Sequence, residues 1–309
     1  PDTDDAVNLD SKPVLLCELF TPRGAPTKLI LGNTTDLFVF DESGAEALYL
    51  TPRYETGTVS ITNGTATLTG SGTSWLANAK AGDFVSVGAT GENDPAETWY
   101  EVDSVDSDTQ ITLTTNYAET TASGDAYTLR QTFTGDIRTP FFTETFLDAT
   151  NVSGTDGDRW YACNGVDAVV AWDGSADQVY VPSLGNVDTC AAMRRFKNIM
   201  VYIAPTTSGE FRGFSVRTTD IGEPEDTVNG FASEFVVHDG PDQLLNGVEF
   251  GELLVLYSER HITLMQFVGG DIVFVLRNAA TGFGPKSSRA IAQFSDHHEF
   301  IGADCKYFF

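Results

Sequence analysis

The chain has 309 residues, enough to bury a large core or hold two or more domains, and 41% of them are hydrophobic. Its formal net charge of −26 argues against a general nucleic-acid binder, because such binding depends on Lys and Arg side chains that neutralise phosphates. No apolar run approaches the roughly 20 residues that a membrane-spanning helix needs, which argues against a membrane span.

The apolar residues favour strands throughout. They alternate at period two, or form short runs between Gly, Asn, Asp and Pro, and helical periodicity is almost absent. The stretch "CAAMRRF", residues 190–196, is the one place where we expect a short helix or turn. The sequence therefore predicts an all-β fold.

The first predicted part, residues 1–56, contains a strand–turn–strand pattern. Asn33 and Asp36 precede the apolar stretch "LFVF", and we expect a tight turn at residues 41–44 before the next strand. The same layout returns about 130 residues later, so it predicts a repeated structural unit.

The second predicted part, residues 57–133, is rich in Thr and Gly and differs in kind. Asn63 and Gly64 between "VSIT" and "TATLTG" predict a hairpin, since both turn residues tolerate positive φ. Another turn is expected at residues 106–108. We interpret this part as a small β-sandwich or barrel domain inserted into the first unit. Its expected apolar anchors are Trp75, Leu76, Phe84, Val85, Trp99, Tyr100, Val105, Ile111 and Leu113.

The third predicted part, residues 134–309, repeats the first layout. Asn164 and Asp167 precede an apolar stretch and a turn at Asp173 and Gly174, and the extended stretch that follows and ends at Pro182 is expected as the next strand of the same unit. Weaker echoes start near residues 198, 252 and 298. With the second part set aside, the starts are about 40 to 55 residues apart; periods of that size with several strands each are typical of propeller blades. A lone blade cannot bury both faces, whereas radial packing covers them. We therefore expect β-propeller-like blades; a pair of β-sandwiches is the structural alternative.

Two groups of motifs carry a resemblance. The stretches "TGSGTSW" (69–75), "KAGD" (80–83) and "SDTQITL" (107–113) resemble a small β-module that recurs in tail and baseplate proteins of bacteriophages. The stretches "YSERHITLMQF" and "GFGPKSSRAI" are similar to the β-propeller tail proteins of short-tailed phages, which form the nozzle or hub below the portal.

The resemblance implies a non-enzymatic structural protein of the virion tail. It implies a homo-oligomeric ring, usually of six copies, that contacts adjacent tail and adaptor proteins and surrounds the DNA exit channel. An acidic lumen would repel the DNA backbone at short range, so that DNA passes without specific binding. Because the chain opens on Pro1 without Met and stops inside an expected strand, we interpret it as a segment of a longer protein.

Two other functions stay open. One is a receptor-binding tail appendage that recognises the host surface, which exposed Trp75 and Trp99 on one face would favour. The other is a propeller glycoside hydrolase, which needs two carboxylates that face each other across a cleft. The stretch "SGTDGDRW" (153–160) departs from the Asp-box turns of sialidases, so it supports hydrolysis weakly.

The sequence assigns no catalytic, cofactor-binding or metal-binding residue, and no cofactor is expected. His297 and His298 are adjacent on an expected strand and would point to opposite faces, so they rarely bind one ion together. The other histidines are His238 and His261. The group Asp103, Asp106 and Asp108 lacks the calcium-loop pattern, so these residues are expected in solvated turns.

The basic and thiol side chains leave further alternatives open. The basic run at residues 194–197 is expected either at a subunit contact or at a solvated blade edge. The four cysteines form no C-x-x-C pair and are interpreted as separate core thiols, with a disulfide between distant strands left open.

Overall fold

The computed structural model describes residues 16–40, 47–88, 98–136, 138–150, 152, 157–240, 242–270 and 273–309. The chain divides into two compact units. Unit 1 comprises Pro1–Ile137 and Ser175–Tyr180, and unit 2 comprises Arg138–Gly174 and Val181–Phe309. The fold is all-β with five blade-like sheets in a β-propeller arrangement, so the predicted fold class is confirmed. The predicted boundaries at residues 57 and 133 stay a prediction.

The first blade of unit 1 is a four-stranded antiparallel sheet in the order β1-β2-β3-β4. Its strands are β1 (Leu16–Phe20), β2 (Lys28–Gly32), β3 (Leu37–Phe40) and β4 (Ala47–Tyr49). Ile30 and Leu37 lie on one face of this sheet and Phe38 on the other, and all three are buried, so both faces of the blade are covered. The expected turn at residues 41–44 lies outside the described residues.

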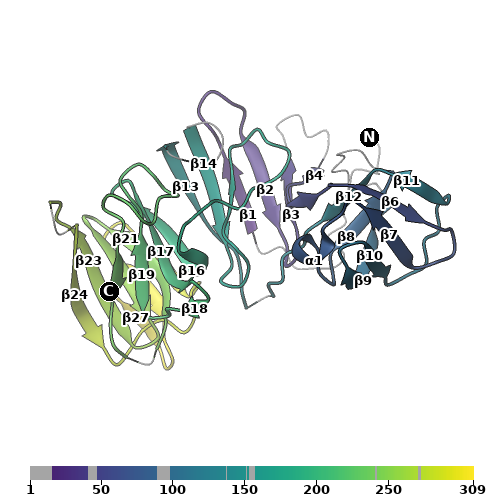
Figure 1. The fold of residues 1–309 in the computed structure, drawn as a ribbon. Coiled ribbons are helices and arrows are strands. Elements are labelled where there is room, and N and C mark those ends of the chain that lie inside the picture. Colours follow the sequence, from purple (N-terminus) through teal and green to yellow (C-terminus); the bar gives the residue numbers. More distant parts are fainter. Residues whose placement is uncertain are drawn as a thin grey trace, which may run out of the picture. The chain divides into compact units, whose positions relative to one another are not determined.

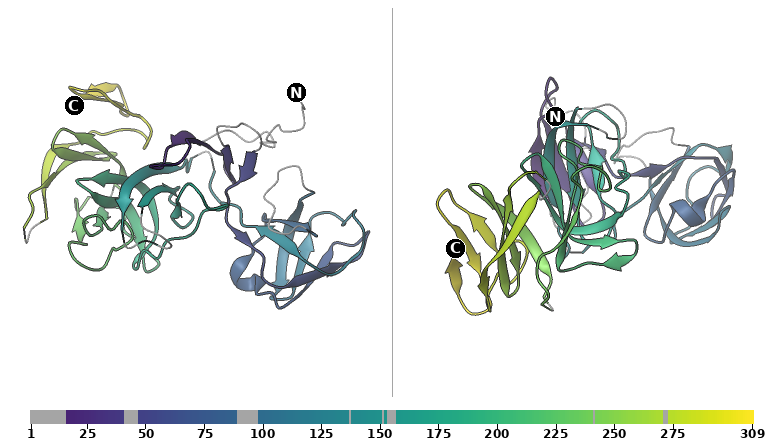
Figure 2. Two further views of the ribbon diagram at one scale, coloured as in Figure 1. Left: turned by 90° about the horizontal axis from the view of Figure 1, so that it is seen from above. Right: turned by 60° about the vertical axis from the view of Figure 1, so that its left-hand side comes forward.

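The rest of unit 1 is an eight-stranded sheet in the order β11-β6-β7-β10-β9-β8-β12-β5. Its elements are β5 (Arg53–Tyr54), β6 (Thr58–Ile61), β7 (Thr67–Ser71), α1 (Trp75–Asn78), β8 (Phe84–Val87), β9 (Tyr100–Ser107), β10 (Gln110–Leu113), β11 (Ala122–Asp125) and β12 (Tyr127–Arg130). The strands are curled, and α1 lies at one end of the curled sheet (Figure 1, Figure 2). β6 and β7 pair as the predicted hairpin, and Gly64 in the turn has φ of +83°.

The interior of this sheet contains most of the expected anchors. Trp75, Val85, Tyr100, Ile111 and Leu113 are buried in one hydrophobic cluster, and Val105 packs against it. Leu76 is 63% exposed, so it is not an anchor; its place on the outer side of the one-turn helix α1 explains the error.

The resemblance motifs have structural roles in this sheet. A Cβ added to Gly70 would lie 2.3 Å from Thr73 Oγ1 and 2.7 Å from Trp75 Cη2, so the first glycine of "TGSGTSW" admits the indole ring. The Trp75 indole N–H donates to the Tyr127 hydroxyl at 3.0 Å. In "KAGD", the Asp83 carboxylate accepts from the Lys80 backbone N–H at 2.9 Å. These motifs therefore stabilise the module.

Unit 2 contains four further blades, all antiparallel (Figure 1). The first has β13 (Phe142–Ala149), β14 (Gly157–Cys163) and β15 (Val170–Trp172); the second has β16 (Val187–Phe196), β17 (Ile199–Thr207), β18 (Glu210–Phe211), β19 (Ser215–Thr218) and β20 (Glu234–Val236). The third has β21 (Leu244–Phe250), β22 (Leu253–Ser258), β23 (His261–Phe267) and β24 (Phe274–Thr281); the fourth has β25 (Ile291–Gln293), β26 (His298–Ile301) and β27 (Lys306–Phe308). In each blade the first strand is an edge strand, and β16 packs beside both β13 and β21.

The repeated sequence pattern forms the same turn twice. The Asn33 side-chain oxygen accepts hydrogen bonds from the backbone N–H groups two and three residues later, at 2.8 and 2.7 Å. Asn164 does the same at 3.0 and 2.8 Å. An Asn side chain that mimics a backbone turn explains why Asn stands at both positions.

Two expectations about unit 2 are wrong. Residues 190–196 form part of β16, because their backbone pairs with β17 over its whole length; alternate side chains such as Cys190 and Ala192 are buried between blades. The extended stretch after Gly174 does not join the blade of β13–β15. Residues 175–180 belong to unit 1, where the Val179 N–H donates to the Leu50 carbonyl at 2.9 Å.

The four cysteines are free, so no disulfide joins distant strands. The interpretation as core thiols is wrong for Cys17, which lies on the exposed side of β1, and for Cys305, which is exposed just before β27. Cys163 and Cys190 are buried and their thiols contact each other, and burial raises the pKa of the Cys190 thiol further than this contact does. No helix in the described ranges is long and apolar enough to cross a membrane.

Candidate functional site

A polar pocket of about 450 Å³ lies in unit 2, where the first strands of all four blades meet. This size falls within the range of about 300–1,000 Å³ that is usual for small-molecule sites. The pocket is lined by Glu144 of β13, Arg194 and Arg195 of β16, Asn246, Val248 and Glu249 of β21, and Ile291 and Gln293 of β25. We call it the arginine pocket.

Arg194 is held in place by the backbone around it. Its Nε donates to the Gly247 carbonyl of the neighbouring strand β21 at 2.7 Å, and its Nη1 donates to the Met193 carbonyl at 3.0 Å. Its guanidinium lies 5.7 Å from the Phe142 ring centre. Arg289 lies nearby, and burial together with the charge of Arg194 lowers the pKa of Arg289. Arg194 is therefore a fixed positive charge in the pocket wall.

Arg195 differs from Arg194 in its contacts. Its guanidinium lies 5.9 Å from the Phe146 ring centre, and it makes no hydrogen bond or ion pair with any residue that the structure describes. It is only partly exposed. A guanidinium offers five donors in a planar fork, which suits a carboxylate or phosphate. Arg195 is thus the donor group in this pocket that a ligand would satisfy.

Glu144 lies next to these two charges. Burial raises the pKa of its carboxyl above the ordinary value of 4.5, although the Arg195 backbone N–H and the charges of Arg194 and Arg195 oppose that shift. The Thr145 N–H also donates to Glu144 Oε1 at 3.2 Å. A carboxyl group with a raised pKa can hold a proton and donate it to a ligand oxygen.

The far wall of the pocket is formed by Glu249 and its neighbours. The Glu249 carbonyl accepts from Gln293 Nε2 at 2.8 Å and from His298 Nε2 at 3.1 Å, so β21, β25 and β26 are joined at this point. Two guanidiniums and two carboxyl groups line the cavity, so its charge is mixed in a chain that is strongly acidic overall.

The basic run at residues 194–197 therefore has two different roles. Arg194 and Arg195 line the pocket within one unit, and Lys197 forms a surface ion pair with Glu252. The sequence leaves two positions open for this run, a subunit contact or a solvated blade edge. The exposed Lys197 agrees with the second. The two arginines are adjacent in the sequence, but the residues that complete the pocket come from β13, β21 and β25 in three other blades, and no local pattern predicts that they meet.

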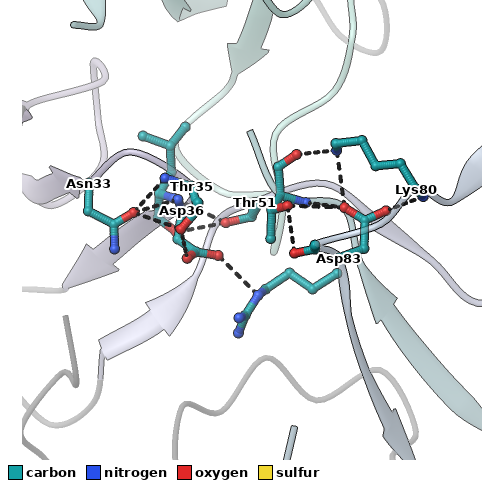
Figure 3. Close-up of polar contacts among 10 residues, drawn as sticks. Asn33, Thr35, Asp36, Thr51, Lys80 and Asp83 are labelled. Atoms are coloured by element: carbon teal, nitrogen blue, oxygen red, sulfur yellow. Dashed lines mark hydrogen bonds and ion pairs between the residues drawn. The ribbon is translucent and has the colours of Figure 1, made fainter. Parts of the chain in front are cut away.

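Unit 1 contains a second polar network, which we assign to stability (Figure 3). Asp36 lies 3.0 Å from Arg130 Nε, and both side chains are almost fully buried. The two groups form an ion pair without a hydrogen bond, because neither Arg130 Nε nor Asp36 Oδ1 has a hydrogen-bond partner with suitable geometry. The Arg130 guanidinium lies 3.6 Å from the centre of the Tyr49 ring and 4.7 Å from that of Trp99.

The tryptophans named as a possible receptor face do not form one. Trp75 is fully buried, and Trp99 is half-buried against Arg130 and Tyr49, with ring centres of Trp99 and Tyr49 5.8 Å apart. Their environments therefore give no support to binding through aromatic side chains of residues 57–133.

The adjacent histidines point to different surroundings, as predicted. His298 is buried, and its Nδ1 lies 2.8 Å from the Tyr257 hydroxyl. His297 contacts Asp296 at 2.7 Å on the surface, which raises the pKa of His297. No ion could be shared by the two rings in this arrangement.

Of the three carboxylates expected in solvated turns, Asp108 alone lies in a turn; Asp103 and Asp106 are exposed but belong to strand β9, which extends to Ser107, so the turn begins two residues later than expected. The Asp106 carboxylate accepts from Thr112 and Ser104 at 2.9 and 3.0 Å, which lowers the pKa of Asp106. Residues 153–156 of "SGTDGDRW" lie outside the described part of the chain.

Comparisons with known proteins define no family for this chain. No family model matches it, and no curated protein matches it. Among solved structures it is similar to a protein titled "Phage phi92 endosialidase", with 12% sequence identity and a TM-score of 0.30. The match covers 97% of this chain and 54% of that one, so the chain spans about half the length of that protein.

The expectation that the chain is not an enzyme is contradicted by this comparison, because the structure found is by its title an enzyme. A non-enzymatic role is what the motif resemblance implies. A glycosidase needs no local sequence motif, since its carboxyl groups come together only in the fold. At this TM-score the likeness assigns no reaction to this chain.

Proposed function

We propose that this chain belongs to a bacteriophage tail and acts there as a receptor-binding appendage, with the arginine pocket as its site for an anionic saccharide. The phage assignment is supported by the motif resemblance at residues 69–75, 80–83 and 107–113. The choice of the appendage over the nozzle is supported by the pocket.

One observation carries the proposal: the guanidinium of Arg195 lines a pocket of ligand size without a protein partner in the described residues. A half-buried cation loses hydration without recovering it in a salt bridge, and a bound carboxylate would restore that loss. Arg194 lies alongside, so a saccharide carboxylate would meet two positive groups, and Glu144 could accept or donate a hydrogen bond to a sugar hydroxyl.

The test compares ligands that differ in one charge. Calorimetry with carboxylated oligosaccharides and with their carboxyl-reduced counterparts should show binding of the first set alone. Arg195→Met should weaken binding at least about tenfold, because a charge-assisted hydrogen bond contributes about 1.5–3 kcal/mol. Arg260→Met removes an exposed arginine outside the pocket lining and is the matched control. Equal binding of both ligand sets, or an effect of Arg260→Met as large as that of Arg195→Met, would refute the proposal.

The homo-oligomeric ring, the contacts with adjacent tail proteins and the passage of DNA remain predictions from the resemblance. The mixed charge of the arginine pocket gives no support to a uniformly acidic lumen in unit 2. The position of the chain relative to the portal axis in intact particles separates the nozzle from the appendage.

Hydrolysis of the bound saccharide is a second candidate, favoured by one observation. Glu144 and Glu249 both line the arginine pocket, and glycoside hydrolysis uses two carboxyl groups of which one holds a proton. The purified chain should then release reducing ends from a carboxylated polysaccharide, and Glu144→Gln and Glu249→Gln should each abolish release without loss of binding. Binding without release in the unmodified protein would leave the appendage as the function.

A further inference from the structure

A second group of side chains in unit 2 has the chemistry of metal ligands. His238 follows β20, Asp242 precedes β21, and His261 begins β23. Their candidate ligand atoms all lie within 4.8 Å of one another, the only such group of three in the described ranges. None of the three lines the arginine pocket.

Asp242 and His261 are already spaced as two ligands of one ion would be. The His261 Nδ1 lies 3.1 and 3.0 Å from the two carboxylate oxygens of Asp242. Two ligands at about 2.0–2.1 Å from a tetrahedral Zn²⁺ lie roughly 3.3 Å apart. The Arg260 N–H donates to Asp242 Oδ2 at 3.1 Å and fixes the orientation of the carboxylate. An ion would therefore need this pair to separate by only a few tenths of an ångström.

His238 supplies the third ligand, a second imidazole nitrogen. Its ring stacks on that of His261, with centres 4.6 Å apart and planes inclined by 14°, and its Nε2 lies 2.8 Å from the Ser258 hydroxyl. A metal lies in the plane of an imidazole that binds it, so one of these two nearly parallel rings would turn about its Cβ–Cγ bond to share an ion with the other. His238 is partly exposed and is the ring that would turn, because His261 already has the spacing to Asp242 that an ion needs.

Gly240 leaves the room in which the three side chains converge. A Cβ added there would lie 2.9 Å from both Asp242 Oδ1 and His261 Cε1, and 3.4 Å from His238 Nδ1. The three side chains thus pack around the Cα of Gly240. A methyl group on that Cα, as in alanine, would displace the Asp242 carboxylate and the His261 ring. This close approach gives a way to disturb the site without removing a ligand.

We propose that His238, Asp242 and His261 form a binding site for a divalent transition-metal ion of the Zn²⁺ class. Two imidazole nitrogens and one carboxylate oxygen suit Zn²⁺ better than Mg²⁺ or Ca²⁺, which prefer oxygen ligands alone. Three protein ligands leave one position for water. The ion would join the loop after β20 to the turn between β22 and β23, and so fasten the second blade of unit 2 to the third.

The test is calorimetry of the full chain, prepared without a histidine tag and stripped with chelator, titrated with ZnCl₂ and separately with CaCl₂. We expect one Zn²⁺ per chain and no comparable binding of Ca²⁺. Replacing a ligand in His261→Ala or His238→Ala should weaken Zn²⁺ binding at least tenfold. His297→Ala removes a surface histidine outside the group and should leave the affinity unchanged.

Two further variants keep the proposal open to refutation if an alanine variant fails to fold. Asp242→Asn keeps the volume of the side chain, and Gly240→Ala retains all three ligands; both should lower the affinity and reduce the rise in melting temperature that Zn²⁺ produces. The proposal is overturned if the unmodified chain binds no Zn²⁺, or if His297→Ala weakens binding as much as His261→Ala does.

Discussion

Replacing Arg130 with Met tests whether the buried ion pair stabilises unit 1. Arg130 and Asp36 have side chains that are 3% and 5% exposed, and Arg130 Nε lies 3.0 Å from the carboxylate. Methionine retains much of the apolar stem but removes the charge. The Asp36 Oδ2 would keep its hydrogen bond from the Thr35 hydroxyl at 2.6 Å, while Oδ1 would face a buried site with no cation.

The expected loss is about 3–5 kcal/mol, the usual effect of removing one partner from a buried ion pair. About 1–2 kcal/mol of that loss comes from the cation–π contacts of Arg130 with the Tyr49 and Trp99 rings, the usual contribution of a desolvated cation over an aromatic face. In an Asp36→Asn background no unpaired carboxylate remains, so Arg130→Met should then cost less than about 2 kcal/mol. The two substitutions are thus expected to be strongly non-additive.

Urea unfolding followed by hydrogen exchange of β12 peptides reports on unit 1 separately from unit 2. Arg260→Met, at an exposed position of unit 2, controls for loss of a positive charge. A loss below about 1 kcal/mol for Arg130→Met, or additive effects of the two substitutions, would contradict the assignment of Asp36 and Arg130 to a stabilising pair.

Three other substitutions test individual positions. Because burial raises the pKa of Glu144 above 4.5, its ionisation costs stability as pH rises from 4.5 through the raised pKa. Glu144→Gln should therefore unfold at higher urea than the unmodified chain at pH 7, with no gain below pH 4.5. Burial lowers the pKa of His298, so its contribution is complete above pH 6.5 and declines as pH falls below it; His298→Gln should flatten the melting temperature between pH 5 and pH 7. Gly70→Ala should cost about 1–3 kcal/mol by overpacking against Trp75, whereas Ser71→Ala at an exposed position should change urea unfolding little.

The strand pattern was predictable because local chemistry specifies it. The turns at Asn33 and Asn164 need only an Asn side chain and the next three residues, so the repeat could be found from spacing alone. The hairpin at Gly64 is equally local. Alternation does not say which sheet a strand joins, however. For that reason residues 175–180 were assigned to the blade of Trp172 although they pair with unit 1.

The two candidate sites could not be predicted from the sequence, because each combines residues that are far apart in it. Glu144 and Arg195 meet only when the first strands of two blades lie side by side. His238 follows β20 and His261 begins β23, and neither stands in a metal-binding motif of the sequence. The adjacent pair His297 and His298 was the more conspicuous pattern, yet neighbouring strand residues face opposite ways.

The net charge describes the exterior of this protein better than its arginine pocket. At physiological ionic strength, the interactions of exposed charges are largely screened beyond about 8 Å, so the −26 acts on an approaching polymer mainly near the surface that carries it. Arg194 and Arg195 act within a pocket, where screening is weaker and a ligand carboxylate would lie within hydrogen-bonding distance. A polyanion without a group that fits the pocket would therefore be repelled by the surface, while an anionic saccharide that fits it would be held by two guanidiniums. Under the proposed function, the same acidic chain would repel nucleic acid and still select a negatively charged ligand.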